Sequence, residues 1–237
     1  MIFRQLFHAE TGTYTYLLGC EQTRESILID PVIDNLETYL QLLRQLKLTL
    51  FAALDTHVHA DHITALGALR ERTGCISMMG EPARASCVSQ TFHDGDQIPF
   101  GKLTLKALHT PGHTDDSYSF LLVAGSDATV QEDWIFTGDT LLIRGSGRTD
   151  FQNGNAHDQY RSIFDRLLSL PDNTRVFPGH DYKGWTMSTI AEERAYNPRL
   201  QVADEKSYAA LMGNLKLANP KLMDVAVPAN LACGKAV

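Results

Sequence analysis

The chain has 237 residues, of which 43% are hydrophobic, so it can bury one sizeable core and we expect a single domain over residues 1–237. Its formal net charge of −7 argues against nucleic acid or an anionic membrane as a partner, because both require a basic face. No window approaches the roughly 20 apolar residues that span a bilayer. The first residues also lack the basic start and the apolar stretch of a signal peptide, so we expect a cytoplasmic protein without a membrane partner.

Predicted strands and helices alternate in blocks along the chain. Strands are expected at 2–7, 13–18 and 26–30, followed by a helix over 34–47 in which leucines recur at spacings of three and four. Further strands are expected at 51–54, 75–79, 103–108, 118–123, 134–137 and 175–177, and further helices at 63–72, 162–170 and 186–196. This α/β alternation is typical of a two-sheet core with helices outside. Residues 218–237 contain two prolines and a glycine, so we expect an irregular segment that packs on the domain.

The cysteines are four in number, and no two of them form a C-x-x-C pair. They are Cys20, Cys75, Cys87 and Cys233. We interpret them as buried, reduced side chains, which is the state expected in a reducing compartment.

Potential metal ligands follow four of the predicted strands, at the point where each strand ends. They are His57, His59, Asp61 and His62 after strand 51–54, His113 after 103–108, Asp139 after 134–137, and His180 after 175–177. Loops at one edge of a sheet would bring these side chains together. Packing does not explain so many buried polar groups, because each would need its own partner, whereas metal binding satisfies them at once.

The run His-x-His-x-Asp-His at 57–62, followed by a His, an Asp and a His at increasing distance, resembles the signature of the metallo-β-lactamase fold superfamily. The resemblance covers nearly the whole chain. It implies an αββα sandwich of two mixed β-sheets, with helices on the outer faces and the site at one sheet edge. The ligand count alone predicts two metal ions, and therefore a dinuclear hydrolase of glutathione thioesters such as glyoxalase II.

Two further segments resemble the persulfide dioxygenase family within that superfamily. They read LLIRGSGRTDFQNG at 141–154 and PGHDYKGWTMSTI at 178–190, the second leading to NPRL at 197–200, and residues 5–7, 15–18 and 227–234 are similar too. The resemblance implies a sulfur dioxygenase of sulfide oxidation. Such an enzyme oxidises glutathione persulfide with O2 and water to sulfite and glutathione, at one mononuclear non-haem Fe(II) per chain.

The family implies a two-His, one-carboxylate set of iron ligands at His57, His113 and Asp139, which leaves positions open for a substrate sulfur and for dioxygen. The remaining ligand-type residues then lie around the iron and hydrogen-bond to waters and to the iron ligands. They are His59, Asp61, His62 and His180.

The positions that match the family's substrate site are mostly basic or aromatic. They are Arg148, Tyr182, Arg199 and Lys183, with Asp150 organising the loop that follows Asp139. Arginine suits glutathione persulfide because it recognises carboxylates by paired, charge-assisted hydrogen bonds. Ser146 stands where the human family member carries cysteine, so no redox role is expected there. Members of the family often pair, which is consistent with a homodimer.

Two rivals to the dioxygenase follow from the same residues. One is the dinuclear thioester hydrolase, and the other is a persulfide-binding or iron-sensing module without turnover. Metal content separates the hydrolase from the dioxygenase, and oxygen uptake by the iron-loaded protein separates the dioxygenase from the binding module.

Overall fold

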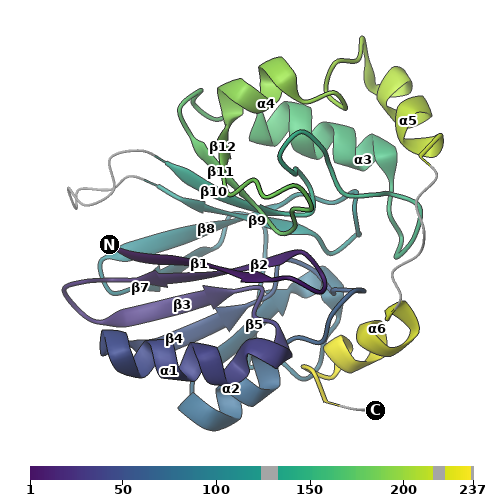
Figure 1. Cartoon of the computed structure of the whole chain (residues 1–237). Helices are drawn as coiled ribbons and strands as arrows, with labels where there is room; N and C mark the ends of the chain where they lie inside the picture. The colour runs from purple at the N-terminus through teal and green to yellow at the C-terminus, as the bar shows by residue number, and fades with distance from the viewer. Residues whose placement is uncertain (124–132, 216–221, 236–237) are drawn as a thin grey trace.

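The computed structural model describes residues 1–123, 133–215 and 222–235, which form two facing β-sheets with helices on their outer sides (Figure 1). The first sheet has six strands in the order β1-β2-β3-β4-β5-β6. They are β1 (Ile2–His8), β2 (Thr13–Gly19), β3 (Glu25–Ile29), β4 (Thr49–Leu54), β5 (Ile76–Gly80) and β6 (Gln90–Phe92). The first two pairings are antiparallel, and the pairings from β3 to β6 are parallel.

The second sheet also has six strands, in the order β12-β11-β10-β9-β8-β7. They are β7 (Gln97–Phe100), β8 (Leu103–His109), β9 (Tyr118–Leu122), β10 (Trp134–Gly138), β11 (Arg175–Pro178) and β12 (Ser188–Thr189). Only β10 and β11 pair in parallel, and the other pairings are antiparallel. Both sheets are therefore mixed, which confirms the predicted αββα architecture.

The helices cover the outer face of each sheet. Against the first sheet lie α1 (Leu36–Leu46) and α2 (Leu66–Thr73), and against the second lie α3 (Ala156–Arg161), its π-helical continuation (Ser162–Leu167) and α4 (Ile190–Tyr196) (Figure 1). Helix α5 (Glu205–Gly213) packs on α3. The short 3-10 turns Ile33–Asn35 and Glu81–Ala83 follow β3 and β5. Among the described residues, none of these helices is both long and apolar enough to cross a bilayer.

Period-two alternation explains why β2 is buried along its whole length. Tyr16 and Leu18 belong to the hydrophobic cluster between the sheets, whereas Leu17 belongs to the cluster under α1 and α2. A strand with both faces covered must be apolar on both faces. A third cluster, which includes Ile163 and Tyr208, fills the space between the second sheet and its helices.

The helix predicted at 162–170 begins earlier in the structure. The Asn155 side chain accepts hydrogen bonds from the backbone N–H groups of His157 and Asp158, so it caps α3 and sets the start of the helix at Ala156. The apolar spacing from Ser162 onward shows only the later part of this helix, because the first turn is polar.

The prediction for the C-terminal segment is wrong for the part of it that the structure describes. Residues 223–231 form α6 (Met223–Leu231), although Pro228 lies inside it. Proline removes one backbone donor, and a short helix packed on a domain tolerates that loss. Residues 218–221 and 236–237 of the predicted irregular segment lie outside the described residues.

The prediction that all four cysteines are reduced is also wrong. Cys87 forms a disulfide with Cys233, at a sequence separation of 146 residues, while Cys20 and Cys75 are buried and free. Two cysteines so far apart give no local spacing signal, since the pairing depends on the tertiary position of the C-terminal segment. The disulfide removes the support that reduced cysteines gave to a cytoplasmic location, and that location stays a prediction.

Candidate metal centre

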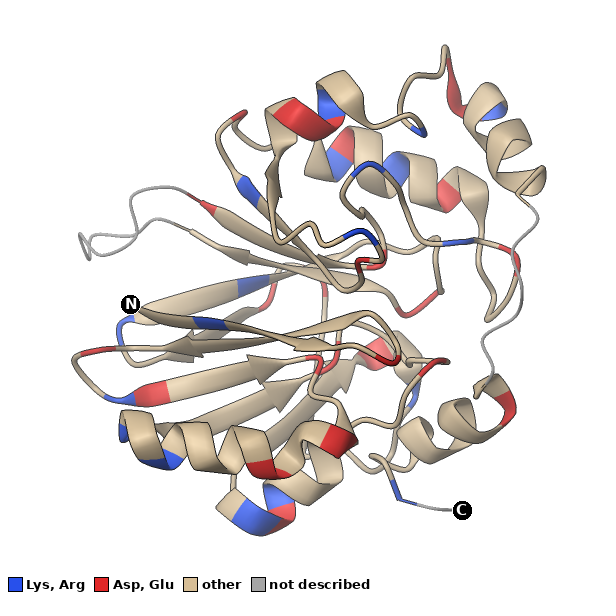
Figure 2. Cartoon of the chain, viewed as in Figure 1, with Lys and Arg blue, Asp and Glu red and all other residues tan. Residues whose placement is uncertain are grey.

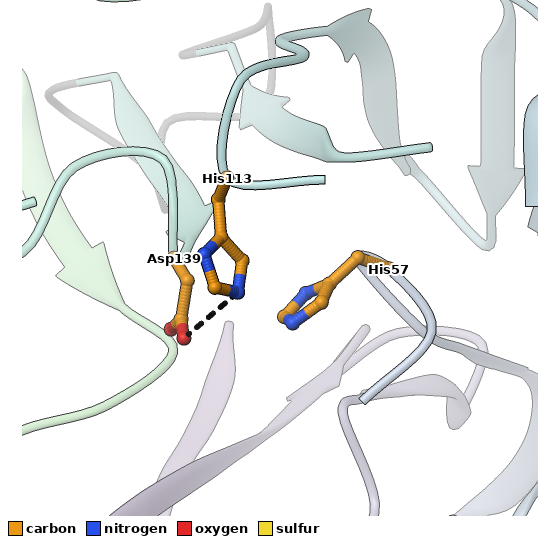
Figure 3. A group of neighbouring side chains, drawn as sticks. All are labelled: His57, His113 and Asp139. Carbon is orange, nitrogen blue, oxygen red and sulfur yellow. Dashed lines mark ion pairs between the residues drawn. The ribbon is translucent and has the colours of Figure 1, made fainter. Parts of the chain in front are cut away.

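Three predicted metal ligands meet at one end of the sandwich. His57 follows β4 of the first sheet, whereas His113 and Asp139 follow β8 and β10 of the second sheet. One ligand atom from each lies within 4.8 Å of the other two, and both imidazole rings face the carboxylate (Figure 3). His113 Nε2 is 3.6 Å from Asp139 Oδ2. Two imidazoles and one carboxylate on facing loops form a donor set that fits a divalent metal ion.

Hydrogen bonds fix the orientation of both imidazoles. His113 Nδ1 donates to the carbonyl oxygen of Arg148 at 2.7 Å, which leaves the Nε2 lone pair for a metal. The Thr56 hydroxyl donates to Asp30 Oδ2 at 2.9 Å, so it can accept from His57 Nδ1, which is 3.0 Å away. These contacts place a proton on Nδ1 of each ring and turn Nε2 toward the position of a metal ion.

Burial and neighbouring charges also favour the protonation states that bind metal. Burial lowers the pKa of His57 well below its ordinary value, and the neighbouring His59 and His113 lower it further. Burial would raise the pKa of Asp139, but the charge of His180 and its hydrogen bond hold that pKa below the usual range of a carboxyl group. A neutral imidazole and an ionised carboxylate are the forms that act as ligands.

His180 lies between two carboxylates. Its Nδ1 is 2.7 Å from Asp139 Oδ1, and its Nε2 is 2.9 Å from Asp61 Oδ2. The backbone supports this position, because Thr13 and His180 form an antiparallel bridge, and the Thr13 hydroxyl is 3.0 Å from His180 Nε2. Both ring nitrogens of His180 are thus in hydrogen-bonding contact with protein side chains.

The other ligand-type residues form a second group beside the first. His59, Asp61 and His62 also have ligand atoms within 4.8 Å of one another. His62 Nδ1 contacts Asp61 Oδ2 at 3.1 Å, and His59 Nε2 contacts Asp30 Oδ1 at 3.1 Å. Two buried ring nitrogens, His59 Nδ1 and His62 Nε2, have no hydrogen-bond partner within the described part of the chain. The structure therefore brings together all seven residues predicted at strand ends.

A cavity of about 300 Å³ opens onto the three-residue cluster. It is lined by the cluster itself and by the loop at 142–148, Phe151, the segment 180–183 and Arg199. All four predicted substrate contacts, Arg148, Tyr182, Lys183 and Arg199, lie on its wall. Acidic and basic segments both occur in the loops at this end of the sandwich (Figure 2).

Two of the three arginines on the wall, Arg148 and Arg199, differ in their partners. Arg148 binds Asp150 through two contacts, at 2.6 and 2.7 Å, and the Asp150 side chain is 54% exposed, so this ion pair lies at the surface. Arg199 donates to the carbonyl oxygen of Ser146 and, at 3.1 Å, to its hydroxyl. No acidic partner of Arg199 occurs among the described residues, and burial lowers the pKa of its guanidinium. Arg199 is therefore the better placed of the two to receive an anionic group.

Sequence reasoning missed Asp30, which holds the first loop of the site. Its carboxylate accepts from the backbone N–H of Thr56 at 2.6 Å as well as from the Thr56 hydroxyl, and it contacts His59. Asp30 directly follows β3, so it fits the pattern of polar residues at strand ends from which the metal ligands were predicted. Applying this pattern to every strand would have found it.

Comparison with known proteins shows the family to which the chain belongs. The model of the metallo-beta-lactamase superfamily matches residues 9–180. The human protein named persulfide dioxygenase ETHE1, mitochondrial, is 44% identical over 237 residues, which cover 99% of this chain and 89% of the human protein. The chain belongs to the persulfide dioxygenase family. The crystal structure of ETHE1 from Myxococcus xanthus agrees, with 52% identity, a TM-score of 0.93, and coverage of 99% of this chain and 100% of that one.

A more distant likeness concerns the second group of ligand-type residues. A protein designated TTHA1623, solved in a di-iron-bound form, superposes with a TM-score of 0.65 at 26% identity, covering 82% of this chain and 98% of that chain. The superfamily fold that this family shares can therefore hold two metal ions in another member. Family membership makes this chain an enzyme of the oxidoreductase class with a metal-binding cluster.

Proposed function

We propose that the chain is a sulfur dioxygenase that oxidises glutathione persulfide with O2 and water to sulfite and glutathione, at one Fe(II) per chain. The observation that carries this proposal is the cluster of His57, His113 and Asp139 at the base of the cavity, in a chain of the persulfide dioxygenase family. In the overall reaction the terminal sulfur of the persulfide becomes sulfite, dioxygen is reduced, and the S–S bond breaks to leave glutathione.

Iron, when bound, would supply the one-electron chemistry that dioxygen requires and that redox-inert zinc lacks. The two imidazoles and the carboxylate would hold the iron beside the cavity that they line. The protein's own contribution is geometric, because the Arg148 carbonyl and Thr56 hold the imidazole rings in fixed orientations. Bringing two reactants to adjacent positions removes much of the entropy cost of their meeting.

In the proposed function the centre holds one metal ion, and His180 supports the ligand Asp139. A second ion beside the first would need Asp61, His62 and His180 as ligands. In this structure both ring nitrogens of His180 contact carboxylates, so binding a second ion would require His180 to give up the Asp61 contact. We assign His59, Asp61, His62 and His180 to the surroundings of the iron, where His180 hydrogen-bonds to the ligand Asp139 and Asp61 in turn contacts His180.

The cavity wall supports a substrate with carboxylates. Arg199 has no acidic partner among the described residues and reaches the cavity from α4's C-terminal side, so we assign it to a glutathione carboxylate. Lys183 and the largely exposed Tyr182 lie at the rim, where they can contact the outer part of glutathione. Arg148 is already paired with Asp150, so we give it the role of holding the 148–151 loop against the site.

A second candidate function is the dinuclear glutathione thioester hydrolase. The di-iron form of TTHA1623 and the proximity of His59, Asp61 and His62 favour it. In that enzyme a metal-activated water would attack a thioester, and no oxygen would be consumed.

Two measurements on one purified sample decide between these functions. Metal analysis should find one iron per chain, and an oxygen electrode should record uptake when glutathione persulfide is added. Two zinc-class ions per chain, together with thioester hydrolysis and no oxygen uptake, would establish the hydrolase instead. Bound iron without oxygen uptake or thioester hydrolysis would indicate a persulfide-binding or iron-sensing module without turnover.

A further inference from the structure

Asn230 lies on the C-terminal helix α6, far along the chain from the metal centre, yet its side chain contacts the loop that carries the first ligands. Its Nδ2 donates to the carbonyl oxygens of His59, at 2.9 Å, and of His62, at 2.8 Å. Its Oδ1 accepts from the backbone N–H of Thr64 at 2.9 Å. The sequence separations are 166 to 171 residues, so this contact exists only in the folded protein.

These three hydrogen bonds satisfy backbone groups that no strand or helix serves. The segment 55–65 runs between β4 and α2, outside the regular pairing of the sheet. Asn230 is fully buried, with 0% of its surface exposed, so water cannot replace its amide. Asparagine offers two N–H donors and one acceptor oxygen in a single plane, which matches two carbonyls and one N–H on a curved loop.

Other backbone groups of the loop are held by residues of other segments. Ile33 N donates to the carbonyl of Ile63 at 2.9 Å, and Ala65 N donates to that of Pro31 at 2.6 Å. Val58 N donates to the Asp116 carboxylate at 2.8 Å. In the part of the loop at 59–62, which begins two residues after His57, Asn230 holds the carbonyls of the first and last residues, His59 and His62.

Helix α6 is itself fixed on the domain, so it can act as a rigid support. Cys233, two residues beyond its end, forms the disulfide with Cys87 and accepts a hydrogen bond from Gly67 N at 3.0 Å. A Cβ atom at Gly67 would lie 2.5 Å from the Cys233 carbonyl oxygen, and one at Gly234 would collide with the Thr64 carbonyl. The turn after α6 therefore packs against the start of α2 with no room for side chains at these two glycines.

We propose that Asn230 is a positioning residue of the metal centre: it fixes the path of the 59–64 loop and thereby holds His57, two residues before this loop, in place beside His113 and Asp139. This inference rests on the proposed function only in placing the metal at His57, His113 and Asp139. The C-terminal helix is thereby part of the metal site, although none of its residues reaches the cavity.

The test compares Co²⁺ binding by the metal-free wild type with that of Asn230→Ala. Co²⁺ reports its ligand geometry by visible absorption, and its affinity can be measured without substrate or oxygen. Residues that orient metal ligands typically change metal affinity by about 10- to 100-fold, and we expect a loss in this range with an altered spectrum. Titrations at low temperature, with circular dichroism to confirm folding, separate this loss from unfolding.

Asn197→Ala is the matched control. Asn197 is also 0% exposed, and its Nδ2 donates to the carbonyls of Leu142 and Gly145 and to the Glu193 carboxylate. Asn197→Ala therefore removes a comparable buried amide that does not contact the 55–65 loop. We expect its Co²⁺ affinity to stay within about twofold of wild type. Unchanged affinity in Asn230→Ala, or an equal loss in Asn197→Ala, would overturn the proposal.

Two further measurements keep the proposal testable if Asn230→Ala does not fold. Asn230→Ser keeps a single donor on a shorter side chain, and we expect an intermediate loss of Co²⁺ affinity. In the wild type, the Thr64 amide should exchange with solvent as slowly as those of β4, and fast exchange would contradict the proposed clamp. If the wild type consumes no oxygen, the proposed function fails, but the Co²⁺ comparison still decides the role of Asn230.

Discussion

At the scale of single residues, the centre depends on which nitrogen of each imidazole faces the point where His57, His113 and Asp139 converge. The Arg148 carbonyl fixes His113, and Thr56 with Asp30 fixes His57, so both rings present Nε2. The same carboxylate that faces these rings, Asp139, also binds His180. The ligand role and the supporting role are therefore assigned to different histidines.

Replacing His113 and His180 tests this division. His113→Ala removes one of three ligands, so iron affinity should fall by more than about 100-fold and activity should be lost with it. His180→Ala leaves all three ligands in place, so iron should be retained with an affinity reduced by no more than about 100-fold. Metal analysis after gel filtration measures both. Iron retained by His113→Ala but lost by His180→Ala would show that the assignment is wrong.

Replacing Arg199 tests the substrate site. A hydrogen bond to a charged group contributes about 1.5–3 kcal/mol, so Arg199→Ala should lower kcat/KM for glutathione persulfide by about 10- to 100-fold, mainly through KM. Iron content should not change. Arg194→Ala is the control, because Arg194 is exposed on α4 and pairs with Asp172 at the surface. Loss of iron from Arg199→Ala would instead indicate a structural role.

At the scale of elements, the sequence predicted which residues cluster at one end of the sandwich better than it predicted the elements that support them. The ligands follow buried apolar strands, and such strands are visible in a sequence as short apolar runs. The early start of α3 depends on the Asn155 cap, and α6 contains a proline, so apolar spacing revealed neither. Asn230 and the pairing of Cys87 with Cys233 join positions more than 140 residues apart, and nothing local marks them.

The disulfide should stabilise the domain by fixing α6. A cross-link that closes a long loop typically contributes about 2–5 kcal/mol, chiefly by restricting the unfolded chain. We expect Cys87→Ser to lower the free energy of unfolding in urea by this amount. Adding dithiothreitol should lower the stability of the wild type to the same level and leave Cys87→Ser unchanged. Equal stability of the oxidised wild type and Cys87→Ser would contradict the role of the disulfide.

At the scale of the whole molecule, the metal centre joins the two halves of the sandwich. His57 comes from the first sheet, and His113 and Asp139 come from the second. A ligand that binds only the folded state stabilises it by about 4 kcal/mol at a concentration 1,000 times its Kd. A metal held by both sheets should thus stabilise the whole fold and not one loop.

Thermal unfolding measures this coupling. For a chain of this size, about 4 kcal/mol corresponds to a rise in Tm of roughly 10 °C on adding Fe(II) to the metal-free protein under nitrogen. His113→Ala should show little or no rise at the same metal concentration. A single transition that shifts as a unit is expected, and a shift confined to part of the unfolding curve would argue against the coupling.

The central claim is that a redox-active metal at His57, His113 and Asp139 oxidises a persulfide with dioxygen. The most direct test loads one metal-free preparation with Fe(II) or with Zn(II) and records oxygen uptake and sulfite with glutathione persulfide. Our account predicts one sulfite formed for each O2 consumed by the iron form, and no enzymatic oxygen uptake by the zinc form. Equal activity of the two forms, or an inactive iron form, would contradict it.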